Sequence, residues 1–301
     1  MPEHLRNRLI RNPRRNHAKT GWLDLFSPGP VVPWTKAYRS RKKTLISETL
    51  RDEDLMVRFR NRESLPSGYG IGIDERCVEY PWLIARLSDE PERYLDAGST
   101  HNHPMILETG FFDQKEMHIV TLHPEPKCYW RRGISYLFAD IRDLPIKDGF
   151  YGTISSISTL EHVGMDNRAY TGGRKMGAPD SRGFVRALQE LDRVLEPGGD
   201  LHVTVPFGRF ADLATSLVFD ADLLRELIRA TPLELVEETY YRYRSSGWQI
   251  ATSDDCADAD FVEWAVQPVS SRFSVFPLQQ DGAAAARAVA CLHFRKDQKT
   301  A

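Results

Sequence analysis

The chain has 301 residues, of which 41% are hydrophobic and 27% are charged, as in an ordinary globular protein. No apolar run approaches the roughly 18 residues that a membrane span needs, and the stretch MPEHLRNRLIRNPRRNH lacks the apolar core of a secretory signal. The four cysteines have no paired spacing, which argues against a disulfide framework or a zinc site. We therefore expect a cytoplasmic protein with no transmembrane segment and no bound metal.

The charge is distributed unevenly along the chain. Residues 1–62 carry 15 Lys and Arg against six Asp and Glu, and the stretch KAYRSRKK (36–43) is part of this basic end. A basic arm can contact a polyanion such as nucleic acid, an anionic membrane surface or an acidic partner, and it can equally be a solvated tail. We predict two regions, a basic N-terminal extension (1–62) and one large α/β domain (63–301).

The predicted elements alternate between helices and strands. ERCVEYPWLIARL (75–87) predicts a helix that leads into the first strand. Beyond it, short apolar runs alternate with helical patterns, which indicates a doubly wound, mostly parallel sheet covered on both faces. We expect helices in 181–199, ending at Gly198 and Gly199, and in 220–231, capped by Asp220. Seven strands are predicted, at 93–98, 117–122, 134–139, 151–158, 201–207, 233–241 and 286–294.

Four segments should meet where the strands of this sheet end. In an open parallel sheet the ligand crevice forms at the carboxyl ends of the strands, where the winding direction reverses. Gly98 allows close backbone approach, and the amides after it can meet an anionic group at a helix N-terminus. The polar, glycine-rich stretch 165–181 is predicted to be a loop near this crevice. The four segments are LDAGST (95–100), TLHPE (121–125), FADIRDLP (138–145) and SISTLEHVGMDN (156–167).

Three stretches together resemble a known family. YLDAGST, ADIRDLPIKDGFYGTISSISTLEHV and RVLEPGGDLHVTVP resemble, in order and spacing, the motifs of class I S-adenosylmethionine-dependent methyltransferases, over roughly residues 76–296. DERCVEYPW and STLEHVGMDN are similar to methyltransferase-like proteins of bacterial surface-polysaccharide clusters. The resemblance implies a Rossmann-like methyltransferase fold, S-adenosylmethionine as cofactor, and O-methylation of a sugar or another small-molecule hydroxyl.

The resemblance also implies a set of cofactor-binding residues. Thr100 and Asn102 stand where the family usually has glycines, and Thr121 stands where it has an acidic residue for the ribose, with Glu125 as a substitute. Asp96 and Gly98 would surround the methionine end of the cofactor, and Asp140 and Ile141 the adenine. The full predicted set is Asp96, Gly98, Ser99, Thr121, Asp140, Ile141 and Ser158.

His162 and Glu161 are the predicted catalytic residues. The stretch TLEHV should start a helix at the floor of the crevice, where imidazole is the side chain best suited to act as a base at neutral pH. Glu161, or Asp166 in the following loop, would orient the ring or replace it, and a packing role for His162 remains open. Histidines at 101, 103, 118 and 123 also allow a metal site, but no carboxylate is spaced with them in a recognised pattern.

Two further functions stay open on the sequence. One is a degenerate, non-catalytic relative that acts as a binding or regulatory partner, suggested by Thr100 and Thr121. The other is an NAD-dependent sugar-modifying enzyme, which shares the fold class but would need a G-x-G-x-x-G turn that is absent. The acceptor is expected to contact 63–82, 165–181 and the aromatic stretch 240–249.

Overall fold

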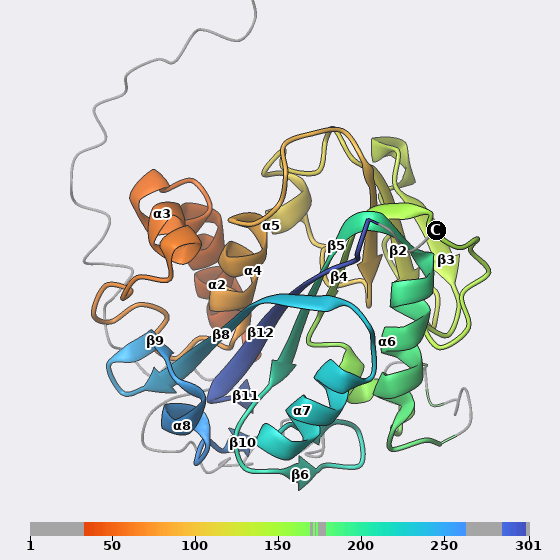
Figure 1. Ribbon diagram of the computed structural model, residues 1–301. Coiled ribbons are helices and arrows are strands. Elements are labelled where there is room, and N and C mark those ends of the chain that lie inside the picture. The colour runs from red at the N-terminus through yellow and green to blue at the C-terminus, as the bar shows by residue number, and fades with distance from the viewer. Residues whose placement is uncertain (1–32, 169–170, 172, 174–178, 263–284, 299–301) are drawn as a thin grey trace, which may run out of the picture.

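A twisted sheet forms the centre of the molecule in the computed structural model, which describes residues 33–168, 171, 173, 179–262 and 285–298 (Figure 1). The strand order in its eight-stranded sheet is β3-β2-β1-β4-β5-β12-β8-β9. Strands β1 to β5 are parallel, whereas β12 runs antiparallel between β5 and β8. The strands are β1 (Arg93–Ala97), β2 (Glu116–Thr121), β3 (Ser135–Phe138), β4 (Tyr151–Ile157), β5 (Leu195–Pro206), β8 (Glu234–Arg244), β9 (Gly247–Ala251) and β12 (Ala288–Arg295).

Helices cover both faces of this sheet. On one face α2 (Lys36–Thr49), α3 (Glu53–Asn61), α4 (Arg76–Ile84) and the short α5 (Pro104–Leu107) share one hydrophobic core. On the other face α6 (Gly183–Val194) and α7 (Ala221–Arg229) share a second core (Figure 1). The predicted doubly wound α/β fold is confirmed, with all seven expected strands. The hairpin strand β9 adds an eighth that the sequence pattern did not predict.

Smaller elements complete the described chain. The 3₁₀ turns are η2 (Trp130–Arg132) and η3 (Leu160–His162), and α8 (Ser253–Cys256) is a single turn with a capping box at Thr252 and Asp255. Two short ribbons pair β6 (Ala211–Asp212) with β7 (Leu217–Val218) and β10 (Phe261–Val262) with β11 (Ala285–Ala286). These ribbons lie outside the main sheet.

The boundary between α6 and β5 differs from the prediction. The helix was expected to continue to Gly198 and Gly199, but it ends at Val194, and Leu195 is already extended with ψ 133°. Pro197 explains the early end, since a proline cannot donate the helical hydrogen bond and disfavours helical geometry in the residue before it. The two glycines instead lie inside a long β5, where a bulge shifts its pairing with β4.

The region 36–61 is part of the packed molecule. Tyr38, Ile46 and Phe59 are fully buried, and α2 and α3 pack against α4. The predicted domain boundary at residue 62 stays a prediction, and residues 1–32 of the basic extension lie outside the described residues. Within the described ranges no helix combines the length and apolarity needed to cross a membrane.

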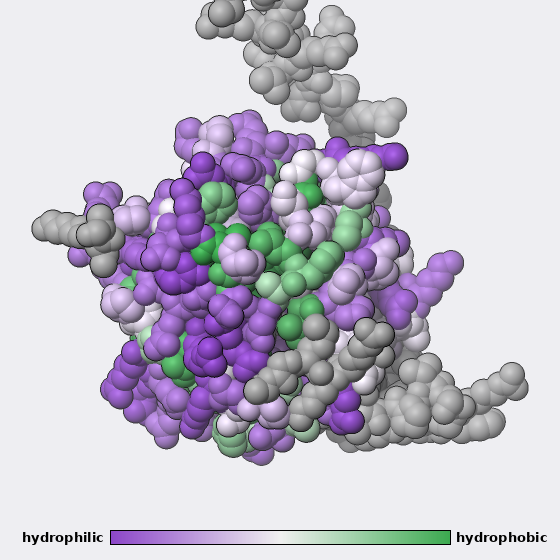
Figure 2. Space-filling model, turned by 90° about the vertical axis from the view of Figure 1, so that its right-hand side faces the viewer, coloured by the Kyte–Doolittle hydropathy of each residue, from purple (hydrophilic) through white to green (hydrophobic). Residues whose placement is uncertain are grey.

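The sheet ends at β3 on the side opposite to β9. Figure 2 shows this face, where a band of hydrophobic surface runs between hydrophilic side chains. Phe138, at the end of this edge strand, is 50% exposed. Because β1 to β4 are parallel, their carboxyl ends lie at the same end of the sheet, and they form the site described next.

Candidate functional site

A cavity of 390 Å³, here called the crevice, lies at the carboxyl ends of β1, β2, β3 and β4. It falls between the two halves of the sheet, where the strand order reverses from β1 to β4. Its volume is in the range of small-molecule sites, roughly 300–1,000 Å³. Six of the nine predicted site residues line it, namely Gly98, Thr121, Asp140, Ile141, Ser158 and His162. Asp96, Ser99 and Glu161 are not among its lining residues.

Asp96 holds the turn after β1 rather than facing the crevice. Its buried carboxylate accepts hydrogen bonds from the amides of Thr100 and His101 and from the Thr100 hydroxyl. The His101 ring lies 2.9 Å from the same carboxylate. Burial alone raises the pKa of Asp96, but the contacts with His101 and Thr100 outweigh burial and leave it lowered. The expected helix N-terminus directly after Gly98 is absent, because Asp96 binds these amides and α5 begins only at Pro104.

Position 98 has no room for a side chain, because the Thr159 side chain lies against it. Its φ is +131°, and a β-carbon added there would lie 2.0 Å from Oγ1 of Thr159. Two non-glycine residues beside it also adopt positive φ, Ser99 at 61° and Ser158 at 37°. Such backbone strain persists only where the surrounding contacts enforce it, and it concentrates at functional sites. The loops after β1 and β4 therefore pack against each other in one enforced geometry.

Thr100 and Asn102 each have a structural role in place of the family's glycines. The Thr100 hydroxyl bonds to Asp96, and its carbonyl accepts a hydrogen bond from the Tyr80 hydroxyl at 2.6 Å. Asn102 accepts a hydrogen bond from the Tyr136 hydroxyl and donates one to the Lys127 carbonyl. These contacts fix the wall of the crevice, so the departures from the family pattern do not leave it collapsed.

Asp140 and Ile141 lie at the β3 end of the crevice. The Asp140 side chain is 29% exposed and accepts hydrogen bonds from the Arg142 guanidinium, the shortest at 2.7 Å. Burial raises the pKa of Asp140, but the hydrogen bonds from Arg142 outweigh it, so the net pKa is lowered. A carboxylate has about four lone-pair positions, so Asp140 can accept a further donor. Thr121 and Glu125 also line the crevice, from the end of β2.

His162 lies at the opposite wall. Its Nδ1 lies 2.7 Å from the Thr215 carbonyl, which can only accept, so this nitrogen carries the proton in the neutral ring. Burial lowers the pKa of His162. The segment 160–162 was predicted to start a helix, but it forms only the 3₁₀ turn η3, whose last residue leads into extended backbone at Val163.

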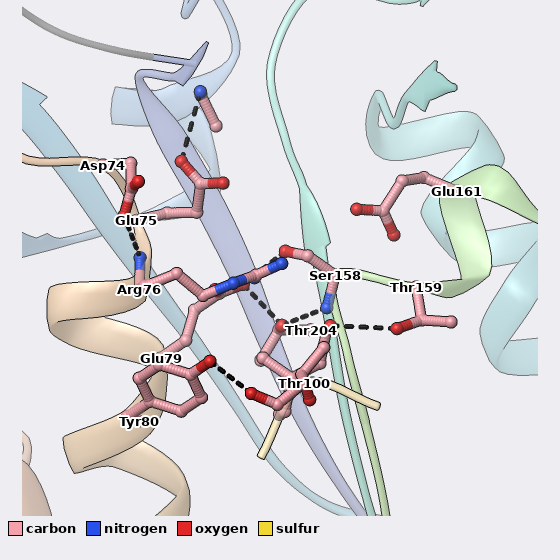
Figure 3. A network of polar contacts seen from close by, with 12 residues as sticks. Asp74, Glu75, Arg76, Glu79, Tyr80, Thr100, Ser158, Thr159, Glu161 and Thr204 are labelled. Carbon is pink, nitrogen blue, oxygen red and sulfur yellow. Dashed lines mark hydrogen bonds and ion pairs between the residues drawn. The ribbon is translucent and has the colours of Figure 1, made fainter. Parts of the chain in front are cut away.

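A buried polar network pins α4 to the ends of β4 and β5 (Figure 3). Glu79 on α4 is fully buried and accepts hydrogen bonds from the hydroxyls of Ser158 and Thr204, at 2.6 and 2.5 Å. It also pairs with Arg76, which lines the crevice. Ser158 was predicted to bind the cofactor, whereas no role was predicted from the sequence for Arg76, Glu79 or Thr204. The sequence feature that coincides with this network is the charged stretch DERCVEYPW, which is part of the family resemblance.

Two carboxyl groups near this network have no lysine or arginine partner among the described residues. The predicted pair of Glu161 and His162 is adjacent, with Oε1 of Glu161 3.9 Å from Nε2 of His162. Glu161 is 3% exposed, and its Oε2 has no hydrogen-bond partner. Glu75 is 9% exposed, and its side chain accepts a hydrogen bond from the Ala286 amide at 3.3 Å. Burial raises the pKa of Glu161 well above its usual range, and burial with Asp74 and Glu79 nearby raises the pKa of Glu75 to about 8. Both groups are therefore poised to hold a proton.

The predicted histidines do not form a metal centre. Across the described ranges, no group of three or more His, Cys, Asp or Glu side chains is arranged to hold a metal ion. His101 is enclosed by Asp96 and aromatic rings, and His118 contacts the Tyr151 hydroxyl. The histidines serve packing and hydrogen bonding in these two cases.

The fold and the crevice define a doubly wound α/β protein with a nucleotide-sized site at its switch point. No protein-family model and no curated sequence matches the chain. A similar solved structure is 1,6-didemethyltoxoflavin-N1-methyltransferase from Burkholderia thailandensis, with bound S-adenosylhomocysteine, at 16% identity over 69% of this chain and 72% of that chain, TM-score 0.39. A second is the [4+2]-cyclase SpnF, which is 20% identical over 71% of this chain and 79% of that chain, with a TM-score of 0.45. A third is an S-adenosylmethionine-dependent methyltransferase from Thermotoga maritima, which is 14% identical over 84% of this chain and 99% of that chain, with a TM-score of 0.40. At these identities and TM-scores the activity of this chain must be inferred from its own site.

Proposed function

We propose that the chain is an S-adenosylmethionine-dependent methyltransferase that acts on a small-molecule acceptor. The observation that carries this proposal is the convergence of four strand ends on one crevice with chemically different ends. Asp140 and Ile141 offer an acceptor and an apolar face at one end, whereas Gly98, Arg76 and Ser158 offer a polar, charged end. This division suits a ligand with a purine at one end and an amino acid at the other.

The predicted residues fit such a cofactor in chemical terms. Asp140 would accept a hydrogen bond from the exocyclic amine of adenine, and Ile141 would pack on the ring. When bound, S-adenosylmethionine supplies an electrophilic methyl group on its sulfonium. The chain then has to orient donor and acceptor and exclude water, which agrees with the enforced geometry around Gly98 and Ser158.

A sugar or other small-molecule hydroxyl, as in polysaccharide biosynthesis, is the acceptor that the sequence suggests, with His162 as the base. The hydrogen-bond acceptor at Thr215 favours this candidate, because it directs the lone pair of the neutral ring to Nε2. A general base must reach the proton that it removes, within about 3 Å or through one water. His162 lines the crevice and meets the first requirement, which is access.

Calorimetric titration tests the proposal. The purified chain is titrated separately with S-adenosylmethionine, S-adenosylhomocysteine and NAD. We expect heat with the first two and none with NAD, because the turn after β1 lacks the glycines that approach a pyrophosphate. Absence of heat with either S-adenosyl compound would remove the proposed function. Binding without methyl transfer to any acceptor would instead favour the degenerate, regulatory relative.

A further inference from the structure

The feature that the cofactor does not explain is a pair of buried carboxyl groups, Glu75 and Glu161, that have no lysine or arginine partner among the described residues. Glu75 accepts a hydrogen bond from the Ala286 amide, and Oε1 of Glu161 lies 3.9 Å from Nε2 of His162, whereas its Oε2 has no partner. Around them, the neighbouring carboxylates already have cations. Asp74 pairs with Lys42 at 2.6 Å, and Glu79 pairs with Arg76. Neither Glu75 nor Glu161 has an ion pair with a lysine or arginine within the described residues, and both are at least 90% buried.

Glu161 points toward the polar end of the crevice. Its carboxyl group extends across toward Ser158 and the Arg76 guanidinium (Figure 3). Its neighbours in the chain Thr159 and His162 line the crevice, and so do Ser158 and Arg76. Glu161 is not itself among the lining residues, but its carboxyl group lies beside the end of the crevice that is opposite Asp140.

Charge decides what this end of the crevice can take. A neutral hydroxyl acceptor would leave Glu75 with no countercharge and Glu161 with only the His162 ring, whose pKa burial lowers. Buried carboxyl groups without a countercharge stay protonated. A protonated carboxyl group cannot accept a proton from a substrate. An ammonium group would supply the missing positive charge and two or three hydrogen-bond donors. We propose that Glu161, supported by Glu75, forms the acceptor subsite and that the acceptor is a primary or secondary amine.

This inference rests on the proposed function and replaces the hydroxyl suggested by the sequence with an amine. The bound ammonium gives one proton to the Glu161 carboxylate, which passes it to solvent before the reaction and is ionised again. The neutral nitrogen then uses its lone pair to form the N–CH₃ bond while the C–S bond breaks and its electron pair stays on sulfur. The methylated nitrogen carries the positive charge, and its surplus proton leaves through Glu161. The products are the N-methylated amine and S-adenosylhomocysteine.

Binding of small probes tests the subsite without turnover. The chain saturated with S-adenosylhomocysteine is titrated with benzylamine hydrochloride and ethylamine hydrochloride, and with benzyl alcohol and ethanol as matched neutral compounds. We expect the amines to bind at least about 10-fold more tightly than the alcohols, as one ion pair allows. In buffers of different ionisation enthalpy at pH 7, amine binding should release on the order of one proton as Glu161 ionises. The amino group of S-adenosylhomocysteine is present throughout, so the effect belongs to the added amine.

Two variants complete the test. Glu161→Gln should lose the amine preference and the proton release, whereas Glu234→Gln, an exposed glutamate on β8, should keep both. Equal binding of amines and alcohols, no binding of either amine, or an unchanged preference in Glu161→Gln would each overturn the amine subsite. Because S-adenosylhomocysteine is titrated first, failure of the proposed function is seen separately, as the absence of that first binding event.

Discussion

At the scale of single residues, the same side-chain type has different roles at different depths. Asp140 is partly exposed and holds Arg142, so it stays ionised. Asp96 is fully buried, and its carboxylate accepts hydrogen bonds from the backbone amides of the turn after β1. Glu161 is buried with one carboxyl oxygen, Oε2, lacking a hydrogen-bond partner, and burial raises its pKa. Their environments, rather than their positions in a motif, separate an acid that lines the crevice, an acid that holds a turn and a buried acid whose pKa is raised.

Substitution of Asp140 should weaken cofactor binding. Asp140→Ala removes the acceptor at the β3 end of the crevice, and loss of one hydrogen bond to a charged group costs about 1–3 kcal/mol. Calorimetry with S-adenosylhomocysteine measures the loss. Asp143→Ala is the matched control, because Asp143 is exposed, close in sequence and absent from the crevice lining. Equal affinities of the two variants would remove Asp140 from the site.

The pH dependence of kcat/KM should distinguish the two candidate bases. This ratio reports groups in the free enzyme. Burial lowers the pKa of His162, so a mechanism with His162 as base should keep full activity down to below pH 6.5. Burial raises the pKa of Glu161. With Glu161 as base, the loss of activity on acidification should therefore begin at a higher pH than with His162, because the Glu161 carboxylate gains its proton at a higher pH. An acid limb below pH 6.5 that disappears in His162→Asn would assign the base to His162 and count against Glu161.

Glu75 should make the free protein less stable as the pH rises. Its folded pKa is raised to about 8, above the unfolded value of 4.5, so the native state binds more protons between these values. Stability contributed by the neutral form is full below about pH 4.5 and is lost as the pH rises toward 8. Urea unfolding of wild type and Glu75→Gln from pH 5 to 8 measures this. The wild type should lose stability relative to the variant across that window, and parallel curves would contradict the assignment.

At the scale of elements, local patterns predicted what local forces determine. Alternating apolar runs located every strand of the seven expected, and Asp220 caps α7 through the amides of Asp222 and Leu223. The predictions for the turn after β1 and for the start of β5 were wrong. The Asp96 carboxylate binds the amides of that turn, and Pro197 ends the helix before β5. The network of Glu79 was not predictable, since its partners Ser158 and Thr204 lie 79 and 125 positions away. Only the folded sheet brings them together.

The contact between α4 and β5 should therefore control the crevice. Thr204→Val removes the hydroxyl that donates to Glu79 and accepts from the Ser158 amide, at nearly constant volume. Leaving such buried groups unsatisfied costs about 1–3 kcal/mol of unfolding free energy. Because Ser158 lines the crevice, S-adenosylhomocysteine affinity should fall as well.

Thr153→Val provides the matched control for that substitution. Thr153 is buried in β4 and donates to Glu92, but it does not line the crevice. It should cost stability and leave cofactor affinity unchanged. If Thr204→Val and Thr153→Val lowered affinity equally, the network would have no special connection to the site.

At the scale of the whole molecule, the N-terminal helices and the crevice are mechanically connected through Asp74. This residue precedes α4 and is 1% exposed, and it accepts hydrogen bonds from the Tyr38 hydroxyl at 2.8 Å and from Lys42 at 2.6 Å. Both partners lie on α2. The crevice residue Arg76 donates its backbone amide to the same Asp74 side chain. Helix α2 thus neutralises the buried charge at the start of the helix that carries Arg76 and Glu79.

Truncation should separate this structural role from any role of the basic extension in binding. A chain that begins at residue 44 lacks Tyr38 and Lys42 and leaves Asp74 buried without a cation, which costs about 3–5 kcal/mol. We expect a lower melting temperature and weaker S-adenosylhomocysteine binding, both partly restored by Asp74→Asn, because the amide removes the stranded charge.

A chain that begins at residue 33 keeps α2 and should match the full chain in both measurements. If residues 1–32 contact a polyanion, that shorter chain should lose only heparin binding that weakens steeply with salt, since exposed charges are screened over about 10 Å at 0.1 M ionic strength. Unchanged melting of the chain that begins at residue 44 would show that α2 is dispensable and would break the connection from Asp74 to the site.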